Sequence, residues 1–102
     1  MVRIVVSKIA RKDIKEVVDY IKRGSVKYAF LEKQHIEDAI NKLKLQPQKG
    51  KIFLDASPNV RELVFRNYRI VYEIVSDDRI DILTIHHHAR SLGNNPAFKD
   101  ED

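Results

Sequence analysis

The sequence has no cysteine, no tryptophan, and only three glycines and three prolines among its 102 residues. Without cysteine it has no disulfide, no thiolate zinc site and no thiol nucleophile, so any catalysis must use other groups. It also lacks the run of about 18 uncharged apolar residues that a membrane-spanning helix needs, and the N-terminus lacks the order of a signal peptide. These absences predict a single cytoplasmic domain over 1–102, with one modest core and no membrane partner.

Positive charge is concentrated in the first half of the chain. The net charge is +4, but residues 1–51 carry 13 Lys and Arg against 6 Asp and Glu, whereas residues 52–102 carry 6 against 9. A basic region of this kind is typical of proteins that bind a nucleic acid or an acidic protein segment. A solvated, lysine-rich helix surface has the same composition and is the simpler interpretation for most of the individual lysines.

Hydrophobic spacing predicts a strand followed by two helices. A β-branched run within 1–6 predicts the strand, and Ser7 can cap a helix over 8–23. Ser25 can cap a second helix over 26–45. Each helix has one apolar stripe at spacings of three and four residues, so we expect the two to form an antiparallel hairpin.

The second half of the chain has the pattern of a sheet. Alternating residues predict a three-stranded antiparallel meander over 60–88, with a tight turn at Asn67. The fold class is therefore α+β, with the helical hairpin packed on one face of a mainly antiparallel sheet. The segments without predicted strands or helices are a loop over 46–59, where Pro47 breaks the helix and Gly50 permits a tight turn, and a frayed tail over 91–102.

The middle strand of the meander presents two different faces. Alternation places Tyr68, Ile70, Tyr72 and Ile74 on one face, which we expect to be core. Arg69 then lies on the opposite face, together with Glu73. Two interpretations of Arg69 have similar weight, because it can either pair with that carboxylate as a surface residue or hold an anion.

The meander also carries the groups best suited to phosphate chemistry. Arg61, Arg66 and Arg69 lie in or beside its strands, and it ends in His86-His87-His88-Ala89-Arg90. Arginine forks hold anionic oxygens, and histidine moves protons near neutral pH. Successive strand residues alternate faces, so the three histidines cannot all bind one metal ion. A surface metal site at His86 and His88 is a minor alternative, and we expect no metal or other cofactor.

Three segments carry a resemblance to a known family. Val60-Arg61-Glu62-Leu63, Asn67-Tyr68-Arg69-Ile70-Val71-Tyr72 and Ile85-His86-His87-His88-Ala89-Arg90, in this order after a helical hairpin, resemble the RelE/ParE superfamily of bacterial type II toxins. The resemblance covers nearly the whole chain. It implies a toxin, or plasmid stabilisation protein, that a cognate antitoxin neutralises and that reaches operator DNA only through that antitoxin.

The superfamily has two activities, and both remain open at this point. In one branch the toxin cleaves messenger RNA on the ribosome. For this branch the resemblance implies that Arg69 contacts the scissile phosphate and that His87 transfers a proton. The other residues expected to hold phosphates or RNA there are Arg61, Arg90, Lys49, Lys51 and Arg66. In the second branch the toxin poisons DNA gyrase without catalysis, and the helical hairpin and the Pro47 to Gly50 break favour this ParE-like branch. A degenerate member that acts only as a binding module is a further alternative.

Overall fold

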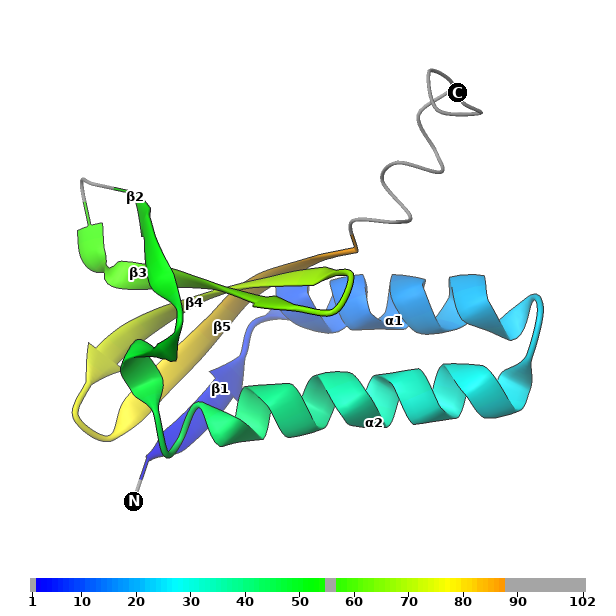
Figure 1. The fold of residues 1–102 in the computed structure, drawn as a ribbon, viewed down its shortest axis with the longest axis horizontal. Coiled ribbons are helices and arrows are strands. Elements are labelled where there is room, and N and C mark those ends of the chain that lie inside the picture. Colours follow the sequence, from blue (N-terminus) through cyan, green and yellow to red (C-terminus); the bar gives the residue numbers. More distant parts are fainter. Residues whose placement is uncertain (1, 55–56, 88–102) are drawn as a thin grey trace.

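The computed structural model describes residues 2–54 and 57–87. Within them two helices stand beside a sheet, as Figure 1 shows, which confirms the predicted α+β class. In chain order the elements are β1 (Arg3–Val6), α1 (Lys8–Lys22), α2 (Val26–Lys42), a 3₁₀ turn η1 (Pro47–Lys49), β2 (Lys51–Leu54), β3 (Ser57–Phe65), β4 (Tyr68–Ser76) and β5 (Arg79–His87).

Both helices begin at the predicted caps. The Ser7 hydroxyl accepts a hydrogen bond from the amide of Ala10 at 3.0 Å, and the Ser25 hydroxyl accepts one from Tyr28 at 3.0 Å. The second helix ends at Lys42 instead of continuing to residue 45. The amides of residues 43–45 bond to carbonyls three positions back, which tightens the last turn before Pro47.

The sheet has the order β1-β5-β4-β3-β2. β1 pairs in parallel with β5, and the remaining neighbours are antiparallel, so the predicted mainly antiparallel sheet is confirmed. The first and last described strands therefore lie side by side. This pairing brings the start of the chain against the end of the meander and sets the position of α1.

The prediction of a loop over 46–59 was wrong in part. β2 lies inside this segment and pairs antiparallel with β3, which already begins at Ser57. The apolar run Ile52-Phe53-Leu54 is a strand because β3 supplies partners for its backbone groups. Pro58 is tolerated because pairing between β3 and β4 begins only at Val60.

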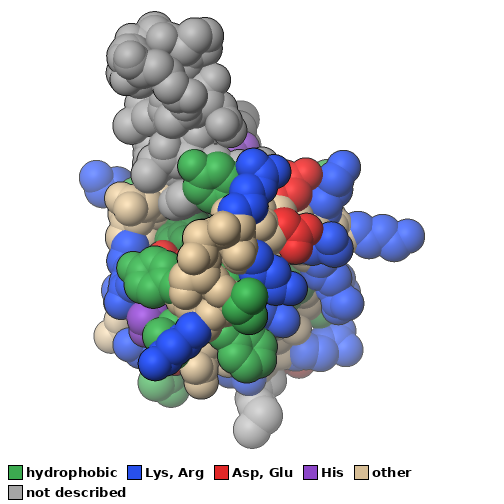
Figure 2. Space-filling view, turned by 90° about the vertical axis from the view of Figure 1, so that its right-hand side faces the viewer, with side chains coloured by type: hydrophobic (Ala, Val, Ile, Leu, Met, Phe, Trp, Pro, Cys, Tyr) green, Lys and Arg blue, Asp and Glu red, His purple; other side chains and the backbone are tan. Residues whose placement is uncertain are grey.

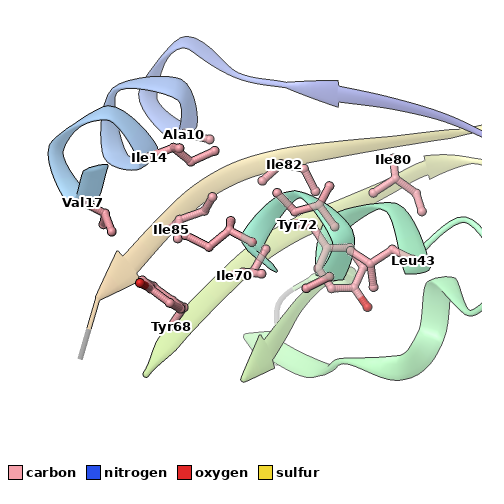
Figure 3. Packing of buried hydrophobic residues seen from close by; sticks show 13 residues of the cluster. Ala10, Ile14, Val17, Leu43, Tyr68, Ile70, Tyr72, Ile80, Ile82 and Ile85 are labelled. Carbon is pink, nitrogen blue, oxygen red and sulfur yellow. The ribbon is translucent and has the colours of Figure 1, made fainter. Parts of the chain in front are cut away.

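The core lies between the helices and one face of the sheet, as Figure 3 shows. Tyr68, Ile70 and Tyr72 of β4 are fully buried on this face, which confirms it as the core face, although Val71 on the opposite face is also buried. From the helices, Ile14 and Ile36 belong to the same cluster. One continuous core thus holds the hairpin against the sheet.

Two side chains at the start of α1 extend the pairing of β5 beyond the end of β1. The pairing of β1 with β5 stops at Ile82. The Ser7 hydroxyl then donates to the carbonyl of Leu83 at 2.9 Å. One carboxylate oxygen of Asp13 accepts from the Ile85 amide at 2.9 Å and from the Thr84 hydroxyl at 2.6 Å. These groups replace a strand partner and fix α1 beside β5.

In the part of the chain that the structure describes, no helix is both long enough and apolar enough to cross a bilayer.

Candidate functional site

The basic residues singled out in the sequence lie on different sides of the sheet. Arg69 is on β4, on the face away from the helices, because its neighbours Tyr68 and Ile70 point into the core. Arg61 on β3 is paired in register with the core residue Tyr72. Directly paired residues share a face of the sheet, so Arg61 lies on the face towards the helices. The two arginines that a phosphate site would need together are therefore separated by the sheet.

A bulge in β5 places a histidine, and not Ile85, opposite Arg69. Val71 is paired with Thr84, but the next residue, Tyr72, is paired with Ile82, so Leu83 is the extra residue. Beyond the bulge, Arg69 is registered opposite His86 and Tyr68 opposite His87. His86, which is exposed, is thus the histidine whose backbone faces Arg69 across the strands.

Arg69 forms an ion pair with Glu62. Its Nε lies 3.2 Å from Oε2 of that carboxylate, and both side chains are partly exposed. Glu62 is on β3, paired with Val71, so it approaches Arg69 diagonally across the strands. The sequence suggested Glu73 as the acid that could pair with Arg69, but the acid that does so in the structure is Glu62. An incoming phosphate would have to compete with this carboxylate for the guanidinium.

Arg61 holds the segment that enters the sheet. Its Nη1 donates to the carbonyl oxygen of Gly50 at 2.8 Å and to that of Gln48 at 3.4 Å. Tyr72 reinforces the same segment, because its hydroxyl donates to the Pro47 carbonyl at 2.6 Å and accepts from the Gly50 amide at 2.9 Å. Burial raises the pKa of the Tyr72 hydroxyl, which therefore stays protonated near neutral pH.

Gly50 is required here by space and not by backbone conformation. Its φ of −75° is open to any residue, so the tight turn expected at this position is not the reason for the glycine. A Cβ would lie 2.8 Å from the Glu62 carbonyl oxygen and 2.8 Å from the Tyr72 hydroxyl. Sequence reasoning missed this contact, because it depends on two residues from other strands.

The remaining predicted RNA contacts are scattered. Lys51 is paired with Glu62 and shares the face of Arg69, whereas Lys49 is exposed at the end of η1. Arg66 and Asn67 form the tight turn between β3 and β4, as the sequence predicted, and Arg66 has the positive φ of 56°. Arg90 lies outside the described residues, as does His88.

A second feature that sequence reasoning missed is centred on Glu32 of α2. Its two oxygens accept from the Tyr68 hydroxyl at 2.9 Å and from Arg66 Nη1 at 3.2 Å, and His35 Nδ1 lies 3.3 Å away. Burial, together with the carboxylate of Glu32, raises the pKa of Tyr68. Glu32 thus ties the middle of α2 to the tip of the β3–β4 hairpin.

The face of Arg69 has mixed charge. Lys51, Arg69 and His86 share it with Glu62 and with acidic residues nearer the other end of the strands, Glu73 and Asp81, which are registered opposite each other. Within residues 2–54 and 57–87, no three His, Cys, Asp or Glu side chains are grouped closely enough to hold a metal ion. On the described part of this face Glu62 is ion-paired with Arg69 and registered opposite Lys51, so an anion would meet a carboxylate beside both of these basic residues.

A groove of about 650 Å³ runs between α1, α2 and β1. Apolar side chains from all three elements line it, among them Ile4, Val18 and Ile40. Charged side chains from both helices also line it, and four are basic against two acidic: Arg11, Lys15, Lys22, Lys33, Asp19 and Glu37. The groove therefore combines an apolar lining with charged side chains, among which the basic ones are in excess.

Comparisons with known proteins agree with this architecture. A sequence model of the family described as "ParE toxin of type II toxin-antitoxin system, parDE" matches residues 4–92. The structure is similar to a solved chain titled "Chromosomal ParDE TA system from P. aeruginosa", with a TM-score of 0.71 and 20% identity over 85% of this chain and 96% of that one. No curated protein matches the sequence. The family match extends from β1 past the end of the meander, and the chain belongs to the ParE toxin family of type II toxin–antitoxin systems.

Proposed function

We propose that the chain is a toxin that a cognate antitoxin neutralises and that inhibits DNA gyrase by binding it, without cleaving RNA. The observation that carries this choice is the separation of Arg61 from Arg69 by the sheet. RNA cleavage by basic residues needs several cations around one phosphate, so that they stabilise the charge of the transition state together. Arg61 is instead bound to loop carbonyls, and Arg69 to Glu62.

Gyrase inhibition and messenger RNA cleavage leave different products in the cell, and these products provide the test. Inducing the chain without an antitoxin should arrest growth, accumulate gyrase–DNA cleavage complexes and leave messenger RNA intact. Arg69→Ala and His86→Ala should remain toxic, because neither residue has a catalytic role in this proposal. Codon-linked cuts in ribosome-bound messages, detected by primer extension and lost in Arg69→Ala or His87→Ala, would establish the nuclease activity instead. Normal growth with abundant folded protein would indicate a non-toxic binding module.

The antitoxin segment would occupy the groove between α1, α2 and β1. An amphipathic helix or extended segment buries apolar side chains in such a groove, and acidic residues on it would complement the basic excess. A short acidic protein encoded beside this gene is the expected partner. Lys33→Glu should weaken rescue from growth arrest when the two are co-expressed, whereas Lys44→Glu, which is exposed after α2, should not. Equal rescue of both variants would place the antitoxin elsewhere.

A further inference from the structure

The first two turns of α2 expose large apolar side chains on nearly every side. Val26, Tyr28, Phe30 and Leu31 are between 43% and 76% exposed. At 100° per residue, these four surround the helix except on the side of Ala29, which is fully buried. A helix on a protein surface normally keeps its outer side polar, so apolar exposure of this extent indicates an interaction site.

The first two turns of α2 belong to the end of the helical hairpin that projects beyond the strands, as Figure 1 shows. From Tyr20 to Leu31 the sequence has three cations, Lys22, Arg23 and Lys27, and no carboxylate. Figure 2 faces this end of the molecule and shows hydrophobic side chains interspersed with Lys and Arg, with most acidic side chains gathered towards the upper right. We name the four apolar residues and the three cations the hairpin tip.

Two acidic residues flank the hairpin tip in sequence, and Asp19, which pairs with Lys15, also lies close enough to Lys22 and Arg23 for their charges to lower its pKa. Glu32, on the other side, does not neutralise the tip. The Glu32 side chain is only 13% exposed, and its oxygens are occupied by Tyr68 and Arg66. The same contacts hold α2 in place on the sheet. At the other end, the Ser25 hydroxyl caps the helix and the amides of Gly24 and Ser25 both bond to the Ile21 carbonyl at 3.0 Å. The apolar side chains are therefore carried on an ordered backbone, which lowers the entropy cost of docking.

We propose that the hairpin tip docks the toxin onto its protein target, by entering an apolar recess rimmed with carboxylates. This inference rests on the proposed function, in which that target is DNA gyrase. A nucleic-acid site is less suited to these residues, because Val26 and Leu31 cannot stack on bases. An interfacial membrane helix needs an apolar face along its length, whereas here the exposed apolar residues are confined to one end of α2.

Charge reversal with matched controls tests this surface. Phe30→Glu and Lys27→Glu would place a carboxylate against the acidic rim, and Leu45→Glu and Lys44→Glu make the same changes outside the hairpin tip at exposed positions. Melting temperatures would confirm that all four variants fold. Binding to purified gyrase tetramer should weaken about tenfold or more in the first two variants, as for other central interface residues, and stay within about twofold in the controls. Growth arrest should weaken in the same order.

The possible failures can be told apart. If the wild-type chain binds gyrase and Phe30→Glu and Lys27→Glu bind as the controls do, the docking surface is overturned and the proposed function survives. If the wild-type chain does not bind gyrase, both are overturned. Loss of binding to plasmid DNA alone or to anionic phospholipid vesicles, instead of to gyrase, would reassign the hairpin tip. If light scattering shows a wild-type dimer that becomes a monomer in Phe30→Glu, the hairpin tip would be reassigned as a contact between two copies of the chain.

Discussion

At the scale of single residues, several side chains that looked functional in the sequence prove to hold the backbone together. Arg61 is the clearest case, because both of its hydrogen-bond acceptors are carbonyls of the segment entering the sheet. A guanidinium has the same chemistry whether it faces a phosphate or a loop carbonyl. Which acceptor it contacts depends on the strand face that carries the arginine and on the backbone segments that pack against that face. Neither can be deduced from the residue type.

Gly50→Ala should destabilise the fold. The new Cβ would lie 2.8 Å from the Glu62 carbonyl oxygen and the Tyr72 hydroxyl, so the loop or β3 must shift. We expect a loss of about 1–3 kcal/mol in the free energy of unfolding, as for other overpacked sites, measured by urea denaturation. Gly24→Ala is the control, since its nearest new contact would be at 3.8 Å, and it should be neutral or slightly stabilising. Equal effects at the two glycines would contradict the packing argument.

Tyr68 should make stability depend on pH in the alkaline range. Burial and Glu32 raise its pKa above the 10.0 of an unperturbed tyrosine, so the folded protein keeps this proton more tightly than the unfolded chain. Its contribution to stability is therefore complete below pH 10 and is lost as the pH rises towards the higher, folded-state pKa. In Tyr68→Phe the unfolding free energy should fall less steeply with pH above about 10 than in the wild type. Parallel pH profiles of the two proteins, measured by denaturant unfolding, would refute the assignment.

At the scale of elements, hydrophobic periodicity predicted the helices and the meander well. Proline and glycine residues, which usually interrupt regular structure, led to a wrong prediction for β2. Pro47, Gly50 and Pro58 all favour a loop over 46–59, yet Lys51–Leu54 is a strand. Its pairing with β3 is a long-range effect that local propensity cannot report. The β5 bulge at Leu83 is of the same kind, and it places His86 instead of Ile85 opposite Arg69.

Asp13 should be important for the attachment of α1 to β5. Asp13→Ala would leave the partly buried Ile85 amide and Thr84 hydroxyl without their acceptor, at a cost of about 1–3 kcal/mol. Amide exchange measured by NMR should speed up at Ile85. Asp19→Ala on the same helix removes a carboxylate whose interactions, chiefly the ion pair with Lys15, are exposed, and it should change the melting temperature little. Unchanged exchange at Ile85 in Asp13→Ala would argue against this role.

At the scale of the whole molecule, the helices and the sheet share one core, so they should unfold together. Ile36 of α2 is fully buried in the cluster that contains Tyr68 and Tyr72 of β4. Ile36→Ala should cost about 2–5 kcal/mol, whereas Leu45→Ala, at an 85% exposed position, should be nearly neutral. Far-UV circular dichroism and tyrosine fluorescence should give coincident transitions in both variants. Helix loss before the fluorescence change would show that the hairpin and the sheet are separate folding units.

The sequence by itself determined the helical hairpin, the buried face of β4, the basic first half and the family resemblance, because these follow from periodicity, capping residues and local motifs. Only the tertiary structure decided that β1 pairs with β5, that Arg61 and Arg69 occupy opposite faces, that Glu62 neutralises Arg69, and that Glu32 is turned inwards beside an exposed apolar tip. The physical reason is strand register. A shift of the register by one residue exchanges the two faces of a strand. The register itself is fixed by packing and by bulges between segments that lie far apart in the chain.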